Sequence, residues 1–186
     1  YFPAIIKAAP RISKGKISGI RGILLDITER KSAEEKIRYM ALHDALTGLP
    51  NRTLIADRFT MAQESSKRRG KLVGCIVFDV DDFKRINDTH GHNAGDFVLK
   101  EIAKRIDHIM RKIDTLARTG GDEFVIILPE IKMIEEVESI AKRIMESMEN
   151  LFNIGEVQVP ITVSIGISIC PKEGCEIEFL LHKADR

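Results

Sequence analysis

The stretch that most constrains the fold is the apolar run over residues 71–80, which leads into Asp79, Asp81 and Asp82. Because nearly every position is apolar, the run predicts a central strand buried on both faces. Sheets that contain such strands bind ligands at the edge where the strands end, so acids there indicate a site. Strand alternation puts Asp79 and Asp81 on one face, where two unpaired carboxylates repel each other and a divalent cation would relieve the repulsion. The alternative is that Asp81 or Asp82 caps a short helix over residues 83–87.

A second acidic cluster comes directly after a pair of glycines. Residues 120–123 read Gly-Gly-Asp-Glu and separate two segments with strand character, residues 115–119 and 124–128. A glycine pair between apolar strands predicts a tight hairpin, because the primed turns need positive φ. A hairpin tip with bare backbone and adjacent acids suits a phosphate with its metal, and the alternative is a solvated turn with two surface acids.

Residues 87–96 form a polar segment that contains glycine, and we expect a loop there. Its end residues Asn87 and Asp96 suit a base edge: an amide and a carboxylate select guanine over adenine, because the carboxylate accepts from both guanine donors. His90 and His92 flank a glycine with no thiolate nearby, so a zinc site is the weaker interpretation. The segment opens into a helix whose apolar stripe is Val98, Leu99, Ile102, Ile106 and Ile109. Residues 111–114 close this helix, where basic side chains interact with the helix dipole.

The rest of the chain after residue 42 alternates further helices and strands. Gly48 and Pro50 break one helix, and Asn51 is suited to cap the next. A lone histidine without a placed partner is more often structural, so His43 is assigned no catalytic role. Apolar spacing predicts helices over 52–66, 131–150 and 176–186, and a long strand or a hairpin over 158–169.

The first 42 residues differ from the rest of the chain. Residues 17–27 predict one strand after an irregular lead, which cannot make a core alone, so this part is expected to be the tail of a domain that begins upstream. A charged helix over residues 29–42 carries Ala33, Ile37 and Met40 at heptad-like spacing over about two heptads. It is either a solvated linker or a signalling helix that pairs in a dimer, and the dimer is favoured.

Composition excludes several classes of protein. The chain has 186 residues, 44% hydrophobic and 31% charged, which suits one soluble domain plus an appendage. A net charge of +1 gives no overall field for nucleic acid or an anionic membrane, and no apolar run is long enough to span a bilayer. The three cysteines, Cys75, Cys170 and Cys175, form no Cys-x-x-Cys pair and favour reduced thiols in the cytoplasm.

These residues together resemble a known family. From about residue 43 to residue 186 the chain is similar to the GGDEF domain of diguanylate cyclases. The motif stands unaltered as Gly120-Gly121-Asp122-Glu123-Phe124, and the family pattern also matches residues 46–52, 78–88, 91–92 and 95–96. The resemblance implies an α/β (α+β) fold like nucleotidyl cyclases and polymerase palms, with a central, mostly antiparallel sheet flanked by helices.

The resemblance also implies an activity: two GTP molecules condense to cyclic di-GMP and release two pyrophosphates. Each protomer of an antiparallel homodimer would hold one GTP. Asp79 and Asp122, with the Val80 carbonyl, would hold Mg²⁺ or Mn²⁺, and Glu123 would act near the attacking 3′-hydroxyl or bind a second metal ion. A quiet GTP-binding module that regulates a neighbouring domain is the alternative, and product sensing as the main role is a weaker one.

The remaining family roles concern substrate and product. They assign guanine reading to Asn87 and Asp96, the phosphate cradle to the backbone at Phe83 and Lys84, the base pocket to Leu99, close backbone approach to Gly120 and Gly121, and an inhibitory product site to Arg111 and Asp114.

Two further features concern the ends of the chain. Residues 26–31 resemble the exit of a PAS sensor domain, which gives three expected parts: a PAS-like tail over 1–28, a linker helix over 29–42 and the GGDEF domain over 43–186. The family domain continues, after an Ala-Asp pair that matches Ala184 and Asp185, with a Lys and an Arg that contact phosphates. That segment is expected beyond Arg186.

Overall fold

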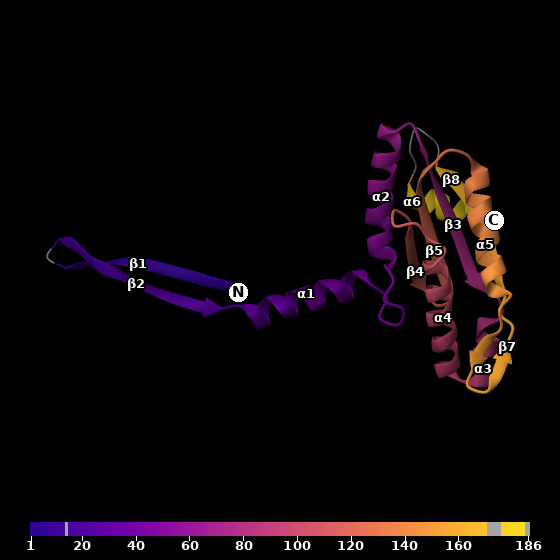
Figure 1. The fold of residues 1–186 in the computed structure, drawn as a ribbon, viewed down its shortest axis with the longest axis horizontal. Helices are drawn as coiled ribbons and strands as arrows, with labels where there is room; N and C mark the ends of the chain where they lie inside the picture. Colours follow the sequence, from indigo (N-terminus) through magenta and orange to yellow (C-terminus); the bar gives the residue numbers. More distant parts are fainter. Residues whose placement is uncertain (14, 171–175, 185–186) are drawn as a thin grey trace. The chain divides into compact units, whose positions relative to one another are not determined.

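The structure is a computed structural model that describes residues 1–13, 15–170 and 176–184 (Figure 1). The chain forms two compact units, Tyr1–Ala41 and Leu42–Arg186. The first unit contains an antiparallel hairpin of β1 (Ala4–Ser13) and β2 (Lys16–Asp26), followed by α1 (Thr28–Leu42). The strand β1 was not expected, because only its pairing with β2 distinguishes this Pro-containing lead from an irregular segment.

The helix α1 begins and runs where the sequence predicts. Asp26 accepts a hydrogen bond from the backbone N–H of Thr28 at 2.8 Å, which satisfies one of the unpaired amides at the helix start. None of the residues of α1 is buried, and the heptad-spaced Ile37 and Met40 are exposed. The predicted pairing of this helix in a dimer therefore stays a prediction.

The second unit is built on a four-stranded sheet in the order β4-β5-β3-β8, in which every neighbouring pair is antiparallel. The two inner strands are buried along most of their length, as the apolar runs predict. The bounds of the strands are β3 Leu72–Val80, β4 Thr115–Gly120, β5 Glu123–Ile131 and β8 Val163–Cys170.

Helices cover both faces of this sheet, and each face has its own core (Figure 1). On one face, α2 (Arg52–Arg68) and α6 (Ile177–Ala184) pack on the strands through Ile55, Phe59 and Ile177. On the other face lie α4 (His92–Asp107) and α5 (Ile134–Met148). The Asn51 side chain caps α2 as predicted, accepting from the amides of Thr53 and Leu54. The mixed fold with an antiparallel sheet between helices is confirmed.

Two local predictions about helix bounds were wrong. The segment over 87–96 is not a loop, because α3 (Phe83–His90) and α4 continue through it and only Gly91 lies outside both helices. Residues 111–114 do not close α4, which ends at Asp107; they form a turn in which the Asp114 amide donates to the Arg111 carbonyl. Polar residues therefore stay helical over 87–96, whereas the chain leaves the helix before residues 111–114. Tertiary packing, which local composition does not report, overrides the local preference in both places.

The stretch over 158–169 is neither one strand nor one hairpin. It is divided between β7 (Val157–Val159), which pairs with β6 (Phe152–Ile154), and β8, which pairs with β3. Pro160 separates the two strands, and a proline has no N–H to donate to a continuing ladder. The small β6–β7 hairpin was not predicted.

Candidate active site

Two carboxylates face each other across the central strands. Asp79 on β3 is directly opposite Glu123 on β5, and this is the last pair in the ladder between those strands. In an antiparallel pair, opposed side chains share a face with Cβ atoms about 4.5–5.5 Å apart. Asp79 is exposed and Glu123 is half-buried, so the pair opens to solvent at the strand ends. The fold therefore brings together two acids that are distant in sequence.

An aromatic stack lies next to this pair. Phe78 directly precedes Asp79, and Phe124 directly follows Glu123. The two rings stack, with centroids 5.0 Å apart and planes 1° from parallel. Both rings are essentially inaccessible to solvent, at 1% and 0% exposure. Because strand side chains alternate, burying these rings on one face presents Asp79 and Glu123 on the other.

The hairpin between β4 and β5 has the expected glycines at its tip. Gly121 has φ +52° and Gly120 has φ +154°, and a β-bulge between Arg118 and Gly120 leaves Thr119 as the extra residue. An added Cβ at either glycine would meet nothing within 4 Å, so the tip presents bare backbone to open space. The Thr119 hydroxyl donates to the Glu123 carboxylate at 2.6 Å, which orients that acid, and Asp122 lies in the loop.

The connection from β3 to α3 differs from the predicted helix cap. Asp82 occupies the N-cap position in the left-handed region, with φ 54°, but its side chain makes no capping hydrogen bond. Asp81 lies outside the N-cap position, and its carboxylate accepts from the Ser164 hydroxyl at 2.6 Å. Ser164 is also the ladder partner of Asp79, so both acids lie beside it on the predicted common face. The first turn of α3, at Phe83 and Lys84, thus has no side-chain cap.

The helices α3 and α4 pack against each other, and each carries one candidate base reader. Asn87 is half-buried in α3, and Asp96 is exposed in the first turns of α4. Between them lies Gly95, which is buried and faces the Asn87 side chain. Leu99 is 1% exposed and packs in the core on this face of the sheet, so its predicted place in a base pocket stays a prediction.

The comparisons with known proteins decide the family. A family model described as "Diguanylate cyclase, GGDEF domain" matches residues 41–186. The chain belongs to this family. The crystal structure of the coiled coil and GGDEF domain of DgcB from Caulobacter crescentus, in complex with c-di-GMP, matches with a TM-score of 0.76 and 27% identity, covering 86% of this chain and 84% of that one.

Curated relatives of the GGDEF domain carry different named activities. The bifunctional diguanylate cyclase/cyclic di-GMP phosphodiesterase MucR of Pseudomonas aeruginosa is 36% identical over 158 residues, 85% of this chain and 23% of MucR. The cyclic di-GMP phosphodiesterase NbdA of the same organism is 37% identical over 152 residues, 82% of this chain and 19% of NbdA. The chain spans less than a quarter of these relatives, and membership places it in cyclic di-GMP signalling.

A link that sequence reasoning missed ties the GGDEF hairpin to the segment before α2. The Arg118 guanidinium donates to the Gly121 carbonyl at 2.6 and 2.9 Å and to the Asp44 carboxylate at 2.8 Å. Asp44 also accepts from the Thr47 amide and hydroxyl. Burial raises the pKa of Asp44, but the hydrogen bonds from Thr47 and Arg118 outweigh it and lower the pKa. The local signal at Asp44 indicated a turn only, since its partner is 74 residues away.

We predict that Asp44→Asn lowers the free energy of unfolding at pH 7 by about 1–3 kcal/mol, because Arg118 loses a charged acceptor while it is only 11% exposed. Urea denaturation followed by circular dichroism measures this. A lowered folded-state pKa contributes stability above the unfolded-state value of about 4, and this contribution is lost as the pH falls through the folded-state pKa. The difference between wild type and variant should therefore shrink in acid. A difference that is constant with pH would contradict the role of the Asp44 charge.

The candidate inhibitory pair is formed within one turn at the far end of β4. Arg111 donates from Nε and Nη2 to the Asp114 carboxylate, which also accepts from the Arg111 amide at 2.8 Å. The Asp114 side chain is 1% exposed and the Arg111 side chain is 43% exposed. The hydrogen bond that Arg111 donates to Asp114 raises the pKa of Arg111. Arg111 also lines a cavity of about 350 Å³ with Arg143 of α5.

The oxygen atoms at the strand ends fit magnesium. Mg²⁺ takes oxygen ligands and uses one or two carboxylates besides water and substrate phosphates. Asp79 and Glu123 supply two facing carboxylates, Val80 adds a main-chain carbonyl at the end of β3, and Asp122 lies in the adjacent loop. Within the described part of the chain, no group of three or more His, Cys, Asp or Glu side chains is gathered around one point. An ion here would therefore depend on substrate and water for its other ligands.

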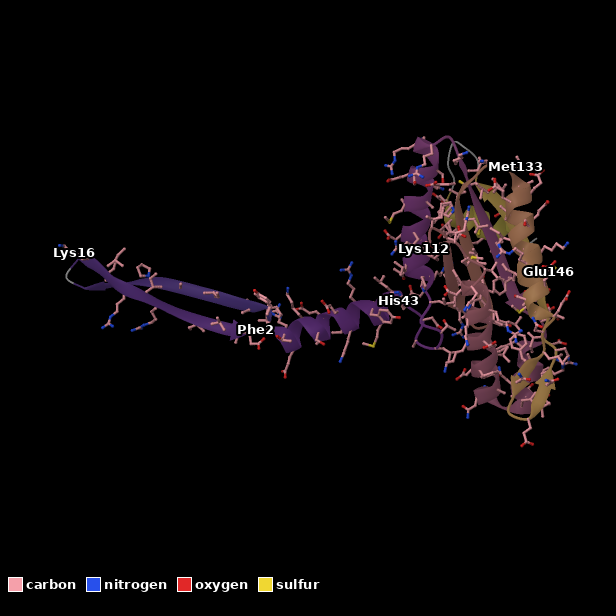
Figure 2. The ribbon with its side chains drawn as sticks, viewed as in Figure 1. Phe2, Lys16, His43, Lys112, Met133 and Glu146 are labelled. Carbon is pink, nitrogen blue, oxygen red and sulfur yellow. The ribbon has the colours of Figure 1, made fainter. Side chains whose placement is uncertain are left out.

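The histidine and the cysteines considered in the sequence lie in positions that suit a structural role. His43, labelled in Figure 2, lies ahead of α2. It forms an isolated β-bridge with Pro50. Cys75 and Cys170 are buried, burial raises the pKa of Cys75 to about 12, and Cys175 lies outside the described residues. No helix in the described ranges is both long and apolar enough to cross a membrane. The cytoplasmic location stays a prediction.

Proposed function

We propose that this GGDEF domain is a diguanylate cyclase that condenses two GTP molecules to cyclic di-GMP and releases two pyrophosphates. The observation that carries the proposal is the ladder pair of Asp79 and Glu123, which places two carboxylates beside a glycine hairpin with open backbone. Attack of a 3′-hydroxyl on an α-phosphate is an in-line displacement that depends on positioning and charge neutralisation. A site with facing acids, bare backbone and an uncapped helix start suits that chemistry.

Each acid has a proposed part in this chemistry. Asp79, Asp122 and the Val80 carbonyl would hold Mg²⁺ or Mn²⁺, which would neutralise phosphate charge when bound. Glu123, oriented by the Thr119 hydroxyl, would accept the proton of the attacking hydroxyl or bind a second ion. Gly120 and Gly121 leave room for a nucleotide to approach the backbone, because neither has a side chain and the space above them is open.

The substrate would be held from α3 and α4. The start of α3 has no side-chain cap, so its amides at Phe83 and Lys84 are suited to bind phosphate oxygens at the positive end of the helix. Asn87 and Asp96 would read guanine, since an amide and a carboxylate match its acceptor and donors. The readers and the hairpin acids hold one GTP, so two protomers would have to face each other for the two nucleotides to react.

The turn at Arg111 would serve as the inhibitory product site. A guanidinium oriented by a buried carboxylate is suited to bind a phosphate or a guanine edge, because its donors are fixed in direction. We predict that Arg111→Ala leaves the rate without product intact and raises at least about tenfold the cyclic di-GMP concentration that halves the rate. Lys112→Ala, a neighbouring exposed cation (Figure 2), is the matched control. Unchanged inhibition in Arg111→Ala would show that this turn is not the inhibitory site.

The test of the activity is direct. The purified protein is incubated with GTP and Mg²⁺, with a phosphodiesterase present to remove product, and nucleotides are separated by chromatography. Formation of cyclic di-GMP is expected, with ATP giving no product. Tight GTP binding without turnover would instead support a quiet regulatory module, the second candidate, which is favoured by the phosphodiesterase name of one relative. Absence of both binding and turnover would contradict both functions.

The first unit would transmit a signal to this domain. We propose that β1–β2 is the end of a PAS-like sensor domain and that α1 pairs with its copy in the dimer. The support is the hairpin with its Asp26 cap leading directly into a helix whose Ile37 and Met40 are exposed. Such pairing would make the distance between two catalytic domains depend on the upstream unit.

A further inference from the structure

The packing of α3 against α4 depends on one glycine. A Cβ at Gly95 would collide with the side-chain oxygen of Asn87 and would lie 3.0 Å from both Asn87 Cγ and Phe83 Cζ. An atom as close as that oxygen is essentially never found around a real Cβ, so the Asn87 side chain would have to move. Gly95 is therefore the position where the two helices share space.

The backbone does not explain the glycine. Gly95 is helical, and its φ is not in the left-handed region that Gly91 and Gly121 occupy. Alanine is the better helix former at such a position, and glycine costs conformational entropy there. The space left to Asn87 and Phe83 is the one feature of the described surroundings that an alanine could not provide.

The Asn87 side chain is placed by this packing. Asn87 is half-buried, and its side-chain amide makes no hydrogen bond with any residue in the described ranges. Its position is consequently set by contact with α4 and not by a polar partner. Asp96 is the next residue after Gly95, so the same turn of α4 carries the second candidate reader.

We propose that Gly95 is a positioning residue that sets base selectivity. Its missing side chain lets the Asn87 amide lie against α4 beside Asp96, so that the amide and the carboxylate present one edge to guanine. The inference rests on the proposed function, because it takes the ligand to be GTP. With alanine at this position Asn87 would rotate away, and the pocket would lose the amide, one of the two groups that distinguish guanine from adenine.

The experiment measures binding and not turnover. Titration calorimetry with Mg²⁺ compares the α,β-methylene analogues of GTP and ATP, which cannot release pyrophosphate, on the wild-type chain and on Gly95→Ala. We expect the guanine analogue to bind about tenfold more weakly to the variant, because one hydrogen bond to the base is lost. The affinity for the adenine analogue should not change. The thermal unfolding midpoint should stay the same or rise, because alanine favours the helix.

Two further variants separate positioning from packing. Gly74→Ala is the matched control. Its Cβ would lie 2.6 Å from Val137 and 2.9 Å from Ile131, in the core against β3 and not against the base readers. This variant should therefore lower the unfolding midpoint and keep the guanine preference. In an Asn87→Ala background, Gly95→Ala should cause no further loss of preference, because the two changes act through one side chain.

Each outcome has a defined meaning. If the wild-type chain shows no preference for guanine, the guanine-reading part of the proposed function fails and this inference fails with it. If the wild type prefers guanine and Gly95→Ala keeps that preference, the inference alone is overturned. It is also overturned by an equal further loss in the Asn87→Ala background, or by an unfolding midpoint that falls as in Gly74→Ala.

Discussion

Replacing Glu123 with glutamine is expected to lower the rate of cyclic di-GMP formation by about 10²–10⁴-fold, the usual effect of losing a positioned proton acceptor. Glutamine keeps the size of the side chain and can still accept the hydrogen bond from Thr119, so the hairpin should keep its shape. What the variant loses is the negative charge opposite Asp79. The measurement is the initial rate with saturating GTP and Mg²⁺, together with the unfolding midpoint.

A matched control makes this result specific. Glu138→Gln removes the same charge from an exposed position on α5, so it should leave the rate unchanged. Full activity of Glu123→Gln would refute the role assigned to this acid. A loss of rate accompanied by a lower unfolding midpoint would show that the substitution acts on the fold and not on the reaction.

Replacing Phe124 with alanine is expected to have the largest effect on stability, a loss of about 3–5 kcal/mol in the free energy of unfolding. Its ring is fully buried and stacks on Phe78 between the central strands, so the change removes the stack and leaves a cavity. A loss of that size is a large part of the stability of a typical domain. Urea denaturation monitored by circular dichroism measures it.

The control for this variant is another phenylalanine of the same domain. Phe97 on α4 is 42% exposed, and Phe97→Ala should change the free energy of unfolding by less than about 1 kcal/mol. Equal losses for the two variants would mean that the buried stack at Phe124 contributes no more to the free energy of unfolding than an exposed phenylalanine does. The expected contrast would indicate that Phe124, the last residue of the GGDEF motif, stabilises the register in which Glu123 faces Asp79.

The sequence alone predicts the elements whose signal is local. The apolar run of β3, the glycine hairpin, the cap at Asn51 and the apolar stripes of α2, α4 and α5 are each contained in one window of the chain. Hydrophobic period and turn chemistry act over a few residues, and both can be recognised without knowledge of the tertiary contacts. The acids at the end of β3 indicated a site for the same reason.

Only the tertiary structure decides which of these residues meet. The facing of Asp79 and Glu123 depends on the register of β3 and β5, in which the buried rings of Phe78 and Phe124 form the neighbouring pair. The bond between Arg118 and Asp44 and the contact of Gly95 with Asn87 depend on how separate elements pack, and no local pattern reports them. The sequence determined where acids, glycines and amides lie along the chain, whereas packing of the two cores around the sheet determined which of them share one site.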